Sequence, residues 1–161
     1  MMLREIRYCR HIKPLATASV FVLGSLFPVL ALLRHDVPTL QDIPLMPDKW
    51  LFAVVWIVLQ SAAMVIFWRT IVIENSPAKK RKVFFTYIGL MALHLLWGLL
   101  YYLTGPTWGC LIIMLLIDLA AVVLTMFLGE IRKPAAFLMA PYLLWLLYAT
   151  FLCVCVVVAN C

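Results

Sequence analysis

Three polar side chains, Gln60, His94 and Asp118, lie inside long apolar runs. An ionised carboxylate at the centre of a membrane helix costs at least about 2.5–3.5 kcal/mol, so such a residue faces the bundle interior or a partner. His94 and Asp118 lie twelve residues on either side of Pro106, which places them at one depth in an antiparallel helix pair. Two interpretations stay open: a polar centre that binds a ligand or moves a proton, and an interhelical hydrogen bond worth roughly 0.6 kcal/mol.

His94 also belongs to an aromatic helical face. At about 100° per residue, His94, Trp97 and Tyr101 lie on one side of a helix. An imidazole, an indole and a phenol suit the wall of a cavity better than a surface in contact with lipid. Imidazole is a standard axial ligand of haem iron. Three roles are therefore open for His94: a core residue bonded to Asp118 or to a backbone carbonyl, a polar contact to a metal-free ligand, and an axial ligand to haem.

Other reactive residues do not form a recognisable site. Cys153 and Cys155 are two residues apart, so on a helix they point about 200° apart and cannot share a metal. The chain has no phosphate-binding loop, zinc-protease motif or hydrolase motif. We therefore predict no catalytic residue, no metal site and no obligatory cofactor.

The composition determines the class of protein that must position these residues. The chain is 66% hydrophobic and 12% charged, and its mean hydropathy is +1.08, whereas soluble domains are nearer half apolar and a quarter charged. This predicts one multi-pass integral membrane domain over residues 1–161. The net charge of +6 is explained by topology and anionic lipid headgroups rather than by nucleic acid.

Apolar runs of membrane-spanning length predict an all-α bundle of five transmembrane helices. The predicted spans are residues 14–33, 50–68, 83–103, 108–129 and 135–159. A cleaved signal peptide is the alternative for the first span, but a 20-residue run without an A-x-A-like exit favours a spanning helix. The proline-rich segment 34–49 is predicted to be a lid over one membrane face, with a plain connector as the alternative.

Basic residues are distributed unevenly between the two sides of this arrangement. Eleven of the 13 Lys and Arg residues lie in the N-terminal segment, in 69–82 and in 130–133. The positive-inside rule then places the N-terminus in the cytoplasm, with segment 34–49 and the C-terminus on the opposite side.

Three aromatic motifs occur in order along the chain. They are Pro47-x-x-Trp50-x-Phe52-x-x-Val55-Trp56, Leu93-x-x-x-Trp97-x-x-x-Tyr101-Tyr102 and Pro141-Tyr142-Leu143-x-Trp145-x-x-Tyr148-Ala149. In this order, within five spans and after a long first loop, they resemble the TspO/MBR family over about residues 14–159. That family comprises the tryptophan-rich sensory proteins and the translocator proteins, also called peripheral-type benzodiazepine receptors.

The resemblance implies a five-helix membrane bundle, often a homodimer, with a pocket on the side of the first loop. That pocket binds porphyrins, haem, sterols or isoquinoline-type drugs. By position, the implied pocket wall consists of Trp50, Trp56, Trp97, Trp108, Trp145, Tyr148 and Ala149. Together with Tyr101 of the aromatic face and the polar positions Gln60, His94, Asp118 and Cys153, these are the candidate ligand-binding residues.

The chain departs from the family at the polar positions. His94 and Cys153 stand where the family has asparagine, and Gln60 stands where it has a tyrosine in the second helix. Asp118 comes about five positions after the usual acidic residue of the fourth helix. No basic residue follows Lys133, so the cholesterol motif after the fifth helix is absent. These changes weaken a sterol interpretation and leave ligand identity open.

The predicted function is that of a membrane receptor, sensor or transporter-like protein. Its predicted partners are the lipid bilayer, a second copy of the chain and a tetrapyrrole, porphyrin or haem, or a similar flat hydrophobic molecule; nucleic acid is excluded. The alternative is a structural or regulatory membrane subunit without a small-molecule ligand. Light-dependent degradation of porphyrin has been suggested for the family, but no catalytic chemistry is recognisable in the sequence, so we predict that the protein is not an enzyme.

Overall fold

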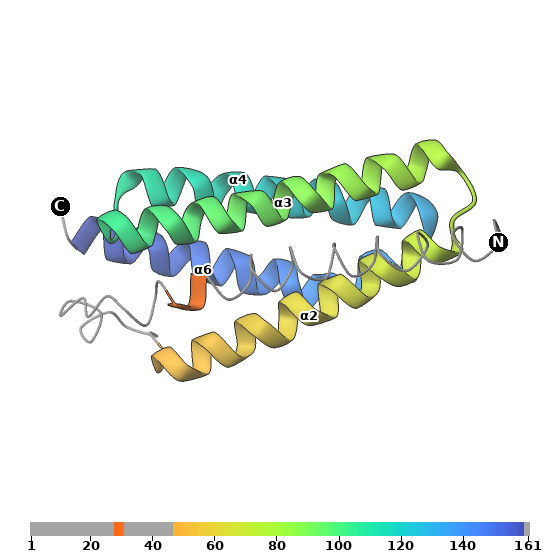
Figure 1. Cartoon of the computed structure of the whole chain (residues 1–161). Coiled ribbons are helices and arrows are strands. Elements are labelled where there is room, and N and C mark those ends of the chain that lie inside the picture. Colours follow the sequence, from red (N-terminus) through yellow and green to blue (C-terminus); the bar gives the residue numbers. More distant parts are fainter. Residues whose placement is uncertain (1–27, 31–46, 160–161) are drawn as a thin grey trace, which may run out of the picture.

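The computed structural model describes residues 28–30 and 47–159, and all the regular secondary structure in this part of the chain is helical. The elements are α2 (Lys49–Ile73), α3 (Pro77–Thr104), α4 (Trp108–Ile131), α5 (Lys133–Leu138) and α6 (Ala140–Ala159). The long helices run lengthwise beside one another (Figure 1). The predicted all-α class is confirmed for these residues. Most of the predicted span 14–33 and of the lid segment 34–49 lies outside the described residues.

Within residues 47–159, four stretches are long and apolar enough to cross a membrane. They are Lys49–Ile73, Pro77–Thr104, Trp108–Ile131 and Lys133–Ala159, with mean hydropathies between 1.9 and 2.8. These helices also turn large apolar side chains outward, for example Phe85, Met126 and Leu144. Outward apolar side chains suit lipid, and helices satisfy their own backbone hydrogen bonds there. The protein is a multi-pass integral membrane bundle.

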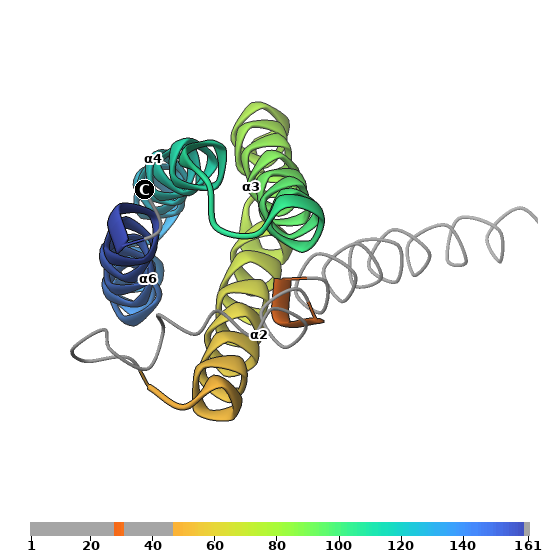
Figure 2. The same ribbon diagram turned by 90° about the vertical axis from the view of Figure 1, so that its left-hand side faces the viewer.

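The helices bury one face each and leave the other to lipid. In α4 all the buried side chains except Leu111, which adjoins Cys110, recur every three or four residues: Cys110, Met114, Ile117, Ala121, Leu124 and Leu128. This is the period that puts residues on one side of a helix. Seen end-on, α4 lies between α3 and α6 (Figure 2). Helix α2 packs against the remaining helices and completes the interior.

Helix α3 begins at Pro77, six residues before the predicted boundary at residue 83. The basic cluster Lys79–Lys82 therefore forms the first turns of a helix rather than a loop. Proline at the first helical position has a suitable φ and lacks only an N–H that would be unpaired there. Lysine and arginine are good helix formers. The predicted boundary at residue 83 is where the apolar run begins, and the helix extends beyond that run.

The last predicted span, 135–159, is interrupted at Met139, where α5 ends and α6 begins. The cause is Pro141, which has no N–H to donate to the carbonyl of Phe137 and whose ring crowds that carbonyl. The backbone tightens instead, and the Met139 N–H bonds the Ala136 carbonyl at 3.1 Å. The Leu143 N–H resumes the helical pattern by bonding Met139 O at 3.0 Å.

A tight turn between the predicted spans 83–103 and 108–129 joins α3 to α4. Gly105 follows the last helical residue with φ 72°, a backbone conformation that favours glycine. Its N–H bonds the Tyr101 carbonyl at 2.9 Å. The short turn makes α3 and α4 antiparallel neighbours, so Trp97 and Tyr101 lie near the same end of the bundle as the start of α4.

Candidate ligand-binding site

A stack of aromatic rings joins α2 to α3. The rings of Trp56 and Trp97 have centroids 6.4 Å apart at an interplanar angle of 22°. Trp97 stacks in turn on Tyr101, at 5.3 Å and 24°. Trp56, Trp97 and Tyr101 are all buried. The helical spacing of residues 97 and 101 places both rings on the face of α3 that meets α2.

The same stack reaches α6 through Phe52. Phe52 is one helical turn before Trp56, and their rings lie 5.8 Å apart at 21°. Phe52 also contacts Trp145 of α6, with ring centroids 4.9 Å apart. Trp145 and Tyr148 are 5.3 Å apart. Aromatic side chains from three helices thus form one continuous wall.

This wall borders a cavity of about 50 Å³. The cavity lies at the end of the bundle where α2 begins and α3 turns into α4. It is lined by Lys49, Phe52, Trp56, Trp97, Tyr101, Pro106, Met114, Ala149, Leu152, Cys153 and Val156. Typical small-molecule pockets are about 300–1,000 Å³. The cavity has the right lining for a flat apolar molecule, but such a molecule requires the side chains to move apart.

Three indole N–H groups around this wall are buried without an acceptor. Within the described residues, the Nε1 atoms of Trp56, Trp97 and Trp145 have no hydrogen-bond partner. Buried donors in folded proteins are usually paired, so each such group needs an explanation. Two of the three belong to side chains that line the cavity. A ligand with acceptor atoms at its edge would satisfy them.

His94 lies beside the aromatic stack, outside the cavity lining. It is fully buried, and its ring meets Trp56 edge-on at 5.4 Å. Nδ1 lies 2.8 Å from the Leu90 carbonyl, which can only accept, so this nitrogen carries the proton. Nε2 then accepts a hydrogen bond from the Tyr142 hydroxyl at 3.4 Å. Both ring nitrogens are therefore engaged within the protein, and an iron ion would have to displace Tyr142.

Asp118 does not pair with His94 in this structure. It is half-buried, and its Oδ2 accepts a hydrogen bond from the Thr150 hydroxyl at 2.7 Å. The bond joins α4 to α6. Asp118 Oδ1 and both amide atoms of Gln60 are buried without a partner among the described residues. Of the two interpretations of Asp118, its geometry matches the interhelical hydrogen bond.

The remaining predicted site residues divide between the cavity and the surface. Ala149 and Cys153 line the cavity, and Tyr148 packs on Trp145 behind it. Trp50 and Trp108 are 63% and 55% exposed and do not line the cavity. Each stands at the beginning of its helix, where tryptophans of a membrane protein meet the headgroup region.

Several cavity residues were not predicted, above all Phe52, Met114, Leu152 and Val156. Helical spacing could have identified some of them, since Phe52 is four residues before Trp56, and Leu152 and Val156 follow Ala149 by three and seven. Tyr142, the partner of His94, belongs to the third aromatic motif but is not among the predicted site residues. Nothing in the sequence alone pairs it with His94, because the pairing depends on how α3 and α6 are rotated.

Comparison with protein families finds a match. The model of the TspO/MBR family matches residues 15–158, which include α2 to α5 and all of α6 except its last residue. A comparison with individually curated proteins finds no match. The match covers most of the chain and the whole aromatic wall, so the chain belongs to the TspO/MBR family.

Proposed function

We propose that the protein is a membrane receptor, sensor or transporter-like protein that binds a tetrapyrrole, porphyrin or haem, or a similar flat hydrophobic ligand, in the aromatic cavity. The observation that carries this proposal is the group of three unpaired, buried indole N–H donors around stacked aromatic rings. A macrocycle offers a face for stacking and acceptor atoms at its edge. Membership of the family adds support. The ligand is bound rather than required as a cofactor.

The small size of the cavity means that a ligand can bind only after a conformational change. Because about 50 Å³ is far below the roughly 300 Å³ of a small ligand pocket, binding must separate the rings of α2 from those of α3 and α6. The bound conformation is then a minor state of the free protein, which lowers the apparent affinity. Titration with ligand should therefore raise the thermal unfolding temperature as well as change the tryptophan fluorescence.

Fluorescence titration with protoporphyrin IX tests the proposal. Trp97→Phe and Trp145→Phe should each lower the affinity about two- to tenfold, because an aromatic contact contributes about 0.5–1.5 kcal/mol beyond its buried area. Trp108→Phe is the matched control, since Trp108 is exposed and does not line the cavity. If both variants of the aromatic wall bind and quench like the parent protein, the ligand site is not this cavity.

The alternative function, a structural or regulatory subunit without a ligand, is favoured by the closely stacked rings and the small cavity. If this alternative is correct, protoporphyrin should cause no saturable quenching of tryptophan fluorescence and no change in the unfolding temperature. We also propose binding without catalysis. Loss of porphyrin absorbance in light, dependent on the purified protein, would contradict that part of the proposal.

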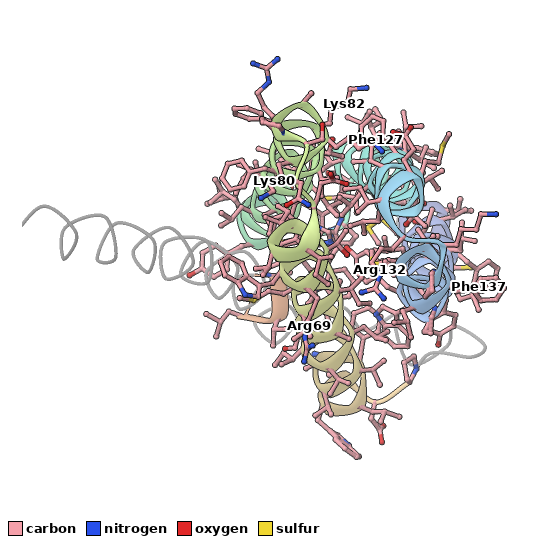
Figure 3. The ribbon with its side chains drawn as sticks, turned by 90° about the vertical axis from the view of Figure 1, so that its right-hand side faces the viewer. Arg69, Lys80, Lys82, Phe127, Arg132 and Phe137 are labelled. Atoms are coloured by element: carbon pink, nitrogen blue, oxygen red, sulfur yellow. The ribbon has the colours of Figure 1, made fainter. Side chains whose placement is uncertain are left out.

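We further propose five spans with the N-terminus in the cytoplasm and the C-terminus opposite. This orientation is supported by the helix bounds, which place Arg69, Lys79–Lys82, Arg132 and Lys133 at one end of the described helices. Figure 3 shows Arg69, Lys80, Lys82 and Arg132 at that end. Reporter fusions should place the segment between α2 and α3 in the cytoplasm, and a cytoplasmic C-terminus would contradict the arrangement. The family resemblance also leads us to propose a homodimer, which cross-linking in membranes would test.

A further inference from the structure

A second cavity lies at the opposite end of the bundle, between α2 and α5. Its volume is about 290 Å³. It is lined by Val65, Ile66, Arg69, Thr70, Arg132, Pro134, Ala135 and Leu138. We call it the α2/α5 groove. Its walls are apolar apart from two arginine side chains and one threonine, so it combines an aliphatic channel with paired positive charge.

The two arginines of the groove are available to a ligand. Both are exposed, and among the described residues neither guanidinium has a hydrogen-bond or ion-pair partner. In Figure 3, Arg69 extends from α2 and Arg132 from the junction of α4 and α5. The Thr70 hydroxyl donates to the Ile66 carbonyl at 2.7 Å, so it is already committed. The guanidinium groups of Arg69 and Arg132 are therefore the side-chain hydrogen-bond donors that remain for a ligand in the groove.

Neighbouring lysines at the same end are engaged differently. Lys79 Nζ donates to the Glu130 carbonyl at 3.4 Å. Lys82 Nζ lies 5.6 Å from the centroid of the Phe127 ring, within range of a cation–π contact. These contacts lie between α3 and α4 and not at the α2/α5 groove. The groove therefore has two arginine charges without an ion-pair partner among the described residues.

The groove lies at the depth of lipid headgroups. Arg69 is twenty residues after Lys49 on α2, about 30 Å along the helix, and the hydrocarbon core is also about 30 Å thick. If Lys49 lies at one membrane interface, Arg69 lies at the other. The walls of the groove continue into the lipid-facing surface, since Val65 and Leu138 are 58% and 64% exposed.

We propose that the α2/α5 groove binds one anionic phospholipid. The headgroup phosphate lies between the guanidinium groups of Arg69 and Arg132, and one acyl chain follows Val65, Ile66 and Leu138 toward the membrane interior. Guanidinium groups match phosphate oxygens with pairs of hydrogen bonds. Charge complementarity and continuity with the lipid-facing surface both select a phospholipid over a soluble anion. The site lies away from the aromatic cavity and does not depend on the proposed tetrapyrrole binding.

Native mass spectrometry of the detergent-solubilised full chain tests this site. The probes are palmitoyl-oleoyl phosphatidylglycerol and phosphatidylcholine with the same acyl chains. The parent protein should hold its first phosphatidylglycerol more tightly than phosphatidylcholine. The double variant Arg69→Gln/Arg132→Gln should bind that lipid roughly 30-fold more weakly, because each basic residue near an anionic lipid contributes roughly fivefold.

The matched control is Lys80→Gln/Arg81→Gln, which removes the same charge at the same end but outside the groove. It should change the affinity less than about threefold, because distant exposed charges are screened. Val65→Trp keeps both arginines, obstructs the acyl channel and should also weaken lipid binding. Equal losses in the two double variants, no loss in the groove double variant, or unchanged binding in Val65→Trp would overturn the proposal. Displacement of the lipid by millimolar inorganic phosphate would also overturn it, because the site would then belong to a soluble anion.

Discussion

The two ends of the bundle are made from the same helices but have opposite chemistry. At one end, the start of α2 and the end of α3 bring Phe52, Trp56 and Trp97 together as buried, stacked rings. At the other end, the last turns of α2 and the first turns of α3 present Arg69, Lys80 and Lys82 as charged side chains at the surface (Figure 3). Because neighbouring helices are antiparallel, the last turns of one helix and the first turns of the next lie at the same end of the bundle.

This contrast determines what each end contributes. Buried rings contribute free energy of folding through packing, and the indole N–H donors of Trp56 and Trp97 have no acceptor among the described residues. Exposed charges contribute little to folding, because water solvates them and salt screens them. We therefore expect substitutions at the aromatic end to alter stability and those at the basic end to alter topology or lipid binding. The following predictions test that division, from the largest expected effect to the smallest.

Trp97→Ala should be the most destabilising of these changes. Trp97 is 6% exposed and stacks on two rings, so its truncation leaves a large void. Removing a buried Trp or Phe costs about 3–5 kcal/mol. The matched change at the basic end is Phe137→Ala, where the ring is 85% exposed, and it should cost under about 0.5 kcal/mol. Reversible unfolding in mixed micelles measures the unfolding free energy of both variants. Equal losses of stability would show that the two ends of the bundle do not differ in their contribution to folding.

His94→Leu should have the next largest effect. It removes the acceptor of the buried Tyr142 hydroxyl, and leaving a buried polar group unpaired costs about 1–3 kcal/mol. His94→Asn retains hydrogen-bonding capacity and should lose less stability.

The same His94→Asn variant tests haem ligation. Since both ring nitrogens of His94 are engaged, we expect the Soret band of bound ferric haem to be the same in the variant and the parent. A shifted band together with weaker haem binding, but unchanged binding of metal-free protoporphyrin, would show that His94 is an axial ligand.

Thr150→Val should have a smaller effect. Its hydroxyl donates to Asp118 Oδ2 and links α6 to α4, and such interhelical bonds contribute about 0.6 kcal/mol on average and up to about 1.7. Thr125→Val is the control, because that hydroxyl bonds the Ala121 carbonyl within α4 itself. A loss of stability as large in Thr125→Val would mean that the interhelical bond contributes nothing specific.

Glu74 should produce the smallest effect, and it depends on pH. The Ser76 N–H bonds the Glu74 carboxylate at 2.6 Å and lowers the pKa of Glu74. A carboxyl with a lowered pKa stabilises the fold above its unfolded pKa, about 4.3 for Glu, and this stabilisation is lost as pH falls through the folded pKa. Glu74→Gln should therefore lower the unfolding temperature slightly at pH 6 and not at pH 3. An equal effect at both pH values would mean that ionisation of Glu74 is irrelevant.

The sequence by itself determined the class of fold, the approximate span boundaries within residues 47–159, the family and the segregation of basic residues. Each of these properties depends on short segments of the sequence or on counts of residues, and not on contacts between helices. A helix must be about 20 apolar residues long to cross the hydrocarbon layer, and a single chain reveals such runs directly. Helical spacing also predicted that Trp97 and Tyr101 share a face, and their stacking matches it.

Only the tertiary structure decided which polar groups meet. Equal depth on antiparallel helices suggested His94 and Asp118 as partners, yet His94 bonds Tyr142 and Asp118 bonds Thr150, both on α6. The reason is rotation: side chains at one depth on two helices meet only if both faces point toward each other, and packing against the third helix sets that angle. The same rotation buries Trp97 in the stack, while Trp108, at the start of the next helix, is left exposed at the surface.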